Sequence, residues 1–106
     1  MIKHIVMWRV RGETSEARRA ASEQVKQIFE RLRPLIPGLL KLEVGIDVSR
    51  VEHACDVVLY TEFDSLHALE AYAEHPEHVR ARRELGDLRV ARFQVDYVPG
   101  EDLGHA

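Results

Sequence analysis

Four segments of the chain place apolar side chains at every second position. They span residues 2–10, 40–48, 56–63 and 88–98. Successive side chains of a β-strand point to opposite faces of a sheet, so this period predicts four strands. In the second segment, the apolar residues that we expect to share one face are Leu40, Leu42, Val44, Ile46 and Val48.

Two stretches between these strands carry apolar residues at the period of an α-helix. The first begins at Thr14 or Ser15, either of which can supply a capping oxygen, and it ends before the Pro37-Gly38 pair. The second begins after Ser65 and is bent at His75-Pro76, because proline lacks the amide hydrogen that a continuous helix needs. Pro76 fits the first turn of a further short helix that runs toward Leu85 and Gly86.

The predicted order is β, α, β, β, α, β, which is the split βαβ order of ferredoxin-like folds. We therefore predict an α+β fold, in which an antiparallel four-stranded sheet carries helices on one face. Apolar side chains also lie on the opposite face, at Ile5, Met7, Val58 and Tyr60. An apolar sheet face of this kind is unfavourable in water, so we expect another protein surface to cover it. A second copy, packed sheet to sheet, gives a two-fold symmetric homodimer with a barrel-like core, a dimeric α/β barrel.

Length, charge and cysteine content narrow the kind of protein. The 106 residues suit one domain, and a single cysteine excludes an internal disulfide. The formal net charge of −3 argues against nucleic acid or an anionic membrane surface as a partner. No apolar stretch approaches the roughly 18 residues of a membrane span, and charges interrupt the N-terminal segment, so we expect a cytoplasmic protein.

Several short motifs recur in one known family in the same order. They are residues 2–8 (IKHIVMW), the Pro37-Gly38 turn, residues 44–47 (VGID), residues 72–79 (YAEHPEHV) and Asp96-Tyr97. On these residues the chain resembles the stress-responsive A/B barrel (Dabb) domain family. The resemblance implies a Dabb domain over residues 1–98, followed by a polar C-terminal tail over residues 99–106. It also implies a dimeric α+β barrel with a cleft between helices and sheet.

A more distant resemblance is to plant polyketide cyclases of this family, of the olivetolic acid type, which close an aromatic ring without a metal or an organic cofactor. Their chemistry uses the residues that correspond here to His4, Tyr72 and His78. The resemblance thus implies cofactor-independent, cyclase- or lyase-like chemistry on a small, partly apolar molecule held in the cleft.

Such a reaction needs a base that removes a proton beside a carbonyl and a donor that stabilises the enolate oxygen. His78 suits the base because imidazole titrates near neutral pH. Tyr72 can donate a hydrogen bond or orient His78, and His4 can hold the substrate or set the tautomer of a partner. We expect His75, one helical turn after Tyr72, and Trp8, as part of the cleft wall, to contact the substrate.

Other interpretations of these residues stay open. The histidines can be structural, with His75 at a helix boundary, and the protein is then a non-catalytic, stress-associated or ligand-holding homodimer. A metal site could use His75, His78, their neighbouring glutamates and His4, but no cysteine pair or helical HExxH supports it, so we expect neither metal nor cofactor. The arginines between positions 80 and 92 alternate with acidic residues and are interpreted as a solvated, salt-bridged surface.

Overall fold

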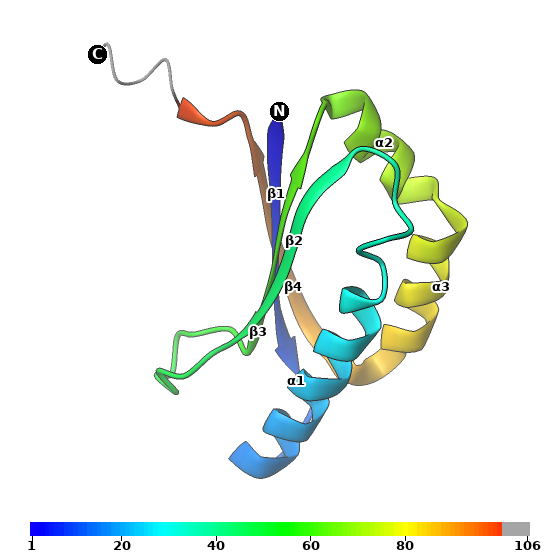
Figure 1. Ribbon diagram of the computed structural model, residues 1–106. Helices are drawn as coiled ribbons and strands as arrows, with labels where there is room; N and C mark the ends of the chain where they lie inside the picture. The colour runs from blue at the N-terminus through cyan, green and yellow to red at the C-terminus, as the bar shows by residue number, and fades with distance from the viewer. Residues whose placement is uncertain (101–106) are drawn as a thin grey trace.

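The computed structural model describes residues 1–100, and residues 101–106 of the predicted tail lie outside the described residues. Its elements, in chain order, are β1 (Ile2–Val10), α1 (Ser15–Glu30), β2 (Leu39–Ile46), β3 (Val57–Phe63), α2 (Leu66–Glu74), α3 (Pro76–Leu85), a short 3-10 turn (Gly86–Leu88) and β4 (Arg89–Tyr97). All three helices lie on one side of a twisted sheet (Figure 1).

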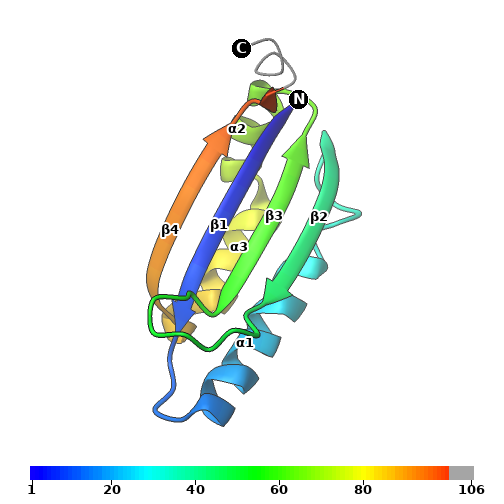
Figure 2. The ribbon, with the colours of Figure 1, turned by 90° about the vertical axis from the view of Figure 1, so that its left-hand side faces the viewer.

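The four strands form one antiparallel sheet in the order β2-β3-β1-β4. Figure 2 looks onto the face that no helix covers, with β1 and β3 in the middle of the sheet. This confirms the predicted ferredoxin-like α+β fold. Because β1 and β4 are neighbours, residues near the two ends of the chain meet on adjacent strands.

Short polar side chains fix where the helices begin. The Thr14 hydroxyl accepts the Ala17 amide at 3.0 Å, and the Ser65 hydroxyl accepts the Ala68 amide at the same distance. Each contact satisfies an amide that has no partner within its own helix. His75 separates α2 from α3 in an extended conformation, so the predicted bend before Pro76 is present.

The core lies between the helices and the inward face of the sheet. Its largest fully buried side chains include Phe29, Leu32, Leu59, Phe63 and Leu85. Phe29 and Leu32 come from α1 and the turn after it, whereas Phe63 reaches α2 and Leu85 ends α3. The helices therefore pack on the sheet as the hydrophobic periods predict.

The sequence pattern was wrong about two residues near the ends of β2. Leu39 pairs with Phe63 and Lys41 with Glu62, so Leu40 is an extra residue in a β-bulge, and its side chain is 59% exposed. Val48 follows the end of β2 and is 88% exposed. Neither joins Leu42 and Val44 in the core. For Leu40 the reason is the bulge, which shifts the inward and outward alternation by one residue, whereas Val48 lies beyond the end of the strand.

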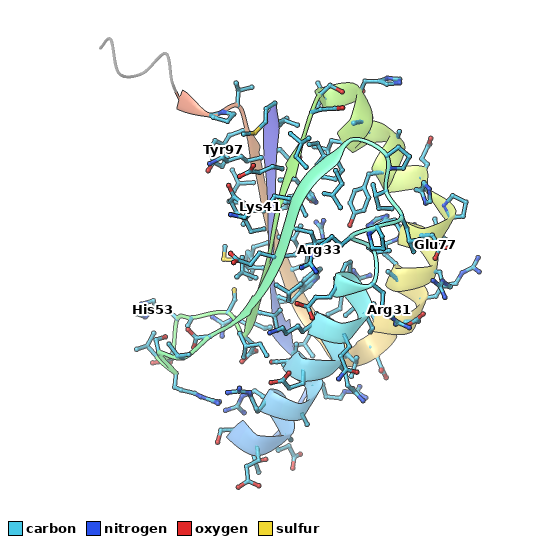
Figure 3. The ribbon with its side chains drawn as sticks, viewed as in Figure 1. Arg31, Arg33, Lys41, His53, Glu77 and Tyr97 are labelled. Carbon is cyan, nitrogen blue, oxygen red and sulfur yellow. The ribbon has the colours of Figure 1, made fainter. Side chains whose placement is uncertain are left out.

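The uncovered face of the sheet is rich in apolar side chains. On β4, Phe93, Val95 and Tyr97 are all exposed, and they pair with the outward residues of β1. Figure 3 shows Tyr97 and Lys41 on this side, whereas Glu77 lies on the helix side. The loop of residues 47–56 projects from the same face (Figures 1 and 2). Among residues 1–100, no helix has the length and apolar character needed to cross a membrane.

Candidate functional site

A cavity of about 650 Å³ lies between the inward face of β1 and β4 and helices α2 and α3. Its polar and ionisable lining consists of His4, Trp8, Glu70, Tyr72, His78, Arg82, Arg89, Arg92, Gln94 and Asp96. Apolar side chains, among them Val6, Leu59 and Leu85, form the rest of the wall. The cavity thus combines an apolar interior with several groups that can exchange protons or hydrogen bonds.

His4 is held by the strand pairing of β1 and β4. It lies directly opposite Asp96, and its ring nitrogen Nδ1 is 2.5 Å from Asp96 Oδ1. An ionised carboxylate only accepts hydrogen bonds, so Nδ1 of His4 is the donor in this contact. The His4 side chain is buried, and its backbone carbonyl accepts the Thr61 hydroxyl at 2.7 Å. Asp96 thus holds the imidazole ring, and Thr61 holds the backbone from which it projects.

Tyr72 projects from α2 into the core and is 3% exposed. Its ring centroid lies 5.1 Å from that of Phe63 and 6.1 Å from that of His4. Its hydroxyl has no hydrogen-bond partner among residues 1–100. Burial raises the pKa of Tyr72 well above its usual range, although the Arg92 charge opposes the shift. The phenol therefore stays protonated at neutral pH and is available as a hydrogen-bond donor.

His78 lies at the start of α3, where its ring packs on Tyr72 with centroids 4.3 Å apart. Its nitrogen Nδ1 is 3.1 Å from the carbonyl oxygen of Ala73. A carbonyl can only accept, so this contact places the proton on Nδ1 and leaves Nε2 with a free lone pair. Burial, aided by the Arg82 charge, lowers the pKa of His78 below its usual range. The neutral ring is the form expected of a general base.

The other two expected substrate-contacting residues lie in different places. Trp8 lines the cavity, stacks on Phe29 with ring centroids 5.0 Å apart, and has an indole nitrogen without a partner among residues 1–100. His75 does not line the cavity. Its Nδ1 accepts the Glu77 amide at 3.1 Å and so caps α3.

The side chains weighed as a metal site engage separate partners. His75 caps α3, His78 contacts a backbone carbonyl, and His4 pairs with Asp96. Across the described part of the chain, no group of three or more His, Cys, Asp and Glu side chains is arranged to hold a metal ion.

Six polar or ionisable lining residues have no site role in the sequence analysis, namely Glu70, Arg82, Arg89, Arg92, Gln94 and Asp96. Most of the arginines between positions 80 and 92 are exposed, as a solvated surface requires, but within residues 1–100 Arg80 is the one member of this group that forms an ion pair, with Glu77. The alternation in β4 carried a signal, since Arg92, Gln94 and Asp96 all occupy its inward face. That signal points to a site only when α3 is known to lie opposite.

Comparisons with known proteins agree with this architecture. A dimeric protein of unknown function and ferredoxin-like fold from Bacteroides fragilis superposes with a TM-score of 0.78 at 34% identity, covering 91% of this chain and 93% of that chain. A Dabb family protein from Mesorhizobium loti gives a TM-score of 0.75 at 21% identity, covering 92% and 95%. A hydroxynitrile lyase from Passiflora edulis gives 0.77 at 15% identity, covering 94% of each chain, and shows the shared fold alone.

The comparison with curated proteins gave no significant match. The family model for the stress responsive A/B barrel domain matches residues 2–99, nearly the full length of the described chain. The motifs at the two ends of the chain, which meet as His4 and Asp96 on neighbouring strands, lie inside this match. The chain therefore belongs to the Dabb family, the stress responsive A/B barrel domain.

Proposed function

We propose that this Dabb protein binds a small, partly apolar molecule in the helix–sheet cavity and removes a proton from one of its carbon atoms. His78 is the base, Tyr72 is the hydrogen-bond donor to the oxygen that gains charge, and His4 with Trp8 orients the molecule. The reaction class is cyclase- or lyase-like and needs no cofactor, because imidazole and phenol supply both functions.

The proposed step moves one proton and one electron pair. Nε2 of His78 takes the proton from a carbon next to a carbonyl, and the ring becomes imidazolium. The electron pair of the broken C–H bond forms a carbon–carbon double bond, and the carbonyl oxygen becomes an enolate. The Tyr72 hydroxyl donates to that oxygen, after which the enolate attacks a second carbonyl or expels a leaving group.

One observation carries this proposal: the Ala73 carbonyl holds Nδ1 of His78, and the ring packs on a tyrosine whose buried hydroxyl has no partner among residues 1–100. A buried hydroxyl without a hydrogen bond costs free energy, so such groups call for an explanation. An oxygen atom of a bound molecule would supply the missing partner. The fold match with a hydroxynitrile lyase supports a lyase-like reading without naming the substrate.

The proposal includes a homodimer that forms through the uncovered sheet face. Exposed apolar residues on β4, such as Phe93 and Val95, give this face the character of an interface. The relative from Bacteroides fragilis is described as dimeric, which supports the same assembly here. The cavity lies on the opposite side of the sheet, so it stays accessible in such a dimer.

An elimination on a neutral aromatic probe tests the base directly. In nitrobenzisoxazole, removal of the C–H proton forms a nitrile as the N–O bond breaks, and the product phenolate is coloured. We expect the protein to accelerate this reaction and His78→Gln to reduce the rate by about 10²-fold, the usual contribution of a general base. His67→Gln is the matched control, because His67 is an exposed histidine that does not line the cavity. Equal rates for the protein and for His78→Gln would contradict the assignment.

A ligand-holding function without catalysis is the second candidate. It is favoured by the Tyr72–His78 contact, which is a ring contact without a hydrogen bond between the two side chains. This function predicts that His78→Gln changes probe binding but that neither protein accelerates the elimination.

A further inference from the structure

We infer that the mouth of the cavity binds the anionic end, a carboxylate or a phosphate, of a molecule whose body is apolar. This inference deepens the proposed function, because it names the chemical class of the molecule that the same cavity takes. It is carried by three arginines that line one cavity from two elements, Arg82 on α3 and Arg89 and Arg92 on β4.

None of these three arginines forms an ion pair or a side-chain hydrogen bond within residues 1–100. By contrast, Arg11, Arg19, Arg31 and Arg80 each contact a carboxylate of a nearby Asp or Glu. Exposed Arg83 is also unpaired within residues 1–100, so what distinguishes the three lining arginines is that they share one cavity.

The acidic side chains of the cavity offset the charge of this group only in part. Asp96 is the acidic residue nearest in sequence to Arg92, and both of its oxygens are engaged, Oδ1 by His4 and Oδ2 by the Gln94 amide at 2.9 Å. The other lining carboxylate, Glu70, forms no ion pair among residues 1–100. Three guanidinium groups thus face two carboxylates, one of which already has both oxygens occupied.

The three charges are close enough to affect one another. Partial burial lowers the pKa of Arg92, and the charges of Arg89 and Arg82 lower it further, with Asp96 in opposition. Like charges held together destabilise each other, and a bound anion would relieve this repulsion. Guanidinium is also the side chain best shaped for two parallel hydrogen bonds to a carboxylate or phosphate.

The apolar part of the lining determines the chemical character of the other end of the molecule. Val6, Leu59 and Leu85 present hydrocarbon to the interior, together with the Trp8 ring. About 650 Å³ accommodates an organic molecule of ordinary ligand size. A molecule with its charge at the arginines and its body along this wall would occupy the same cavity that His78 and Tyr72 line.

Three probes with the same eight-carbon body test the inference: octanoate, octyl phosphate and octanol. Their dissociation constants are measured by following backbone amide shifts in NMR titrations. We expect at least one of the two anions to bind about tenfold or more tightly than octanol, as charged hydrogen bonds predict. The double variant Arg82→Gln/Arg92→Gln should lose most of this preference. Preference for only one anion identifies the head group.

Arg83→Gln is the control for the loss of a neighbouring positive charge, because it removes one charge from the position next to Arg82 on α3, at an exposed residue that does not line the cavity. It should keep the full preference for the anion. The inference is overturned if octanol binds as tightly as both anions, if the double variant keeps the preference, if Arg83→Gln loses it equally, or if no probe binds.

The outcome of this binding test can be distinguished from the outcome for the proposed function. Binding is read without any reaction, and the elimination test uses a neutral probe that does not need the arginines. If the protein shows no preference for the anions but the elimination depends on His78, the inference is wrong and the proposed function stands, with a base that acts on neutral molecules. An anion preference without any elimination would leave a binding site for amphipathic anions.

Discussion

The protons of two histidines are fixed by oxygen atoms that can only accept hydrogen bonds. Ala73 holds Nδ1 of His78 through its carbonyl, and Asp96 holds Nδ1 of His4 through its carboxylate. For His78 this leaves Nε2 as the basic atom, and burial keeps the ring neutral to lower pH than usual by lowering its pKa. Backbone geometry and desolvation therefore prepare the proposed base.

Tyr72→Phe should separate stability from activity. The hydroxyl is buried and has no partner among residues 1–100, so its removal should leave the free energy of unfolding unchanged or raise it by up to about 1 kcal/mol. The same change removes the proposed donor and should slow the nitrobenzisoxazole elimination. Urea unfolding and the elimination rate check the two effects. A clear loss of stability would mean that the hydroxyl has a partner within the protein.

The sequence could suggest some residues of the site but not their partners. Tyr72 and His78 lie six positions apart, and Pro76 interrupts the helix between them, so no helical spacing predicts that their rings meet. The Ala73 carbonyl that contacts His78 belongs to the end of α2, where backbone oxygens lack partners within the helix. The role of Arg92 depends on α3 lying opposite β4, which is a tertiary contact that local pattern does not encode.

Hydrophobic periods predicted the four strands and two helical stretches, and Pro76 predicted the start of α3, whereas these signals missed the irregularity of one strand. Local periodicity encodes which face of an element is apolar, but it assumes that the alternation continues without a break. In β2 the bulge at Leu40 breaks it, because the strand reaches Phe63 through Leu39 instead. The edge position of β2 makes such a bulge tolerable.

A pair of substitutions in β2 tests the position of this bulge. Leu42→Ala should destabilise the protein by about 2–5 kcal/mol, since it removes a buried side chain from the core. Leu40→Thr should change the free energy of unfolding by less than about 0.5 kcal/mol, because Leu40 is exposed. Thermal or urea unfolding gives both values. Comparable decreases in the free energy of unfolding for the two variants would mean that Leu40 is buried in the core and that the bulge is not at this position.

At the scale of the whole molecule, the sheet separates two surfaces with different proposed roles. The helix side encloses the cavity, and the uncovered side presents apolar residues together with the loop of residues 47–56 (Figure 2). A charge introduced on the uncovered side should therefore affect assembly without entering the cavity.

Val95→Glu should convert the proposed dimer into a monomer of about 12.2 kDa. Val95 is exposed on β4 and pairs with Ile5, so a carboxylate there would be buried without a partner in a sheet-to-sheet interface. Sedimentation at micromolar concentration gives the mass. Leu35→Glu is the control, because this exposed residue lies between α1 and β2 rather than on the uncovered face. Dimers that persist in Val95→Glu would argue against this interface.

The proposed role of His78 Nε2 as the base can be tested directly, because the ring nitrogens of His78 are observable by ¹⁵N NMR across a pH series. We expect a proton on Nδ1, a free Nε2, and a pKa below the ordinary value of 6.5. The elimination rate on the same samples should fall with decreasing pH at that same pKa, because protonation of Nε2 removes the base. A proton on Nε2 at neutral pH, or a rate that does not follow the titration of His78, would contradict the account.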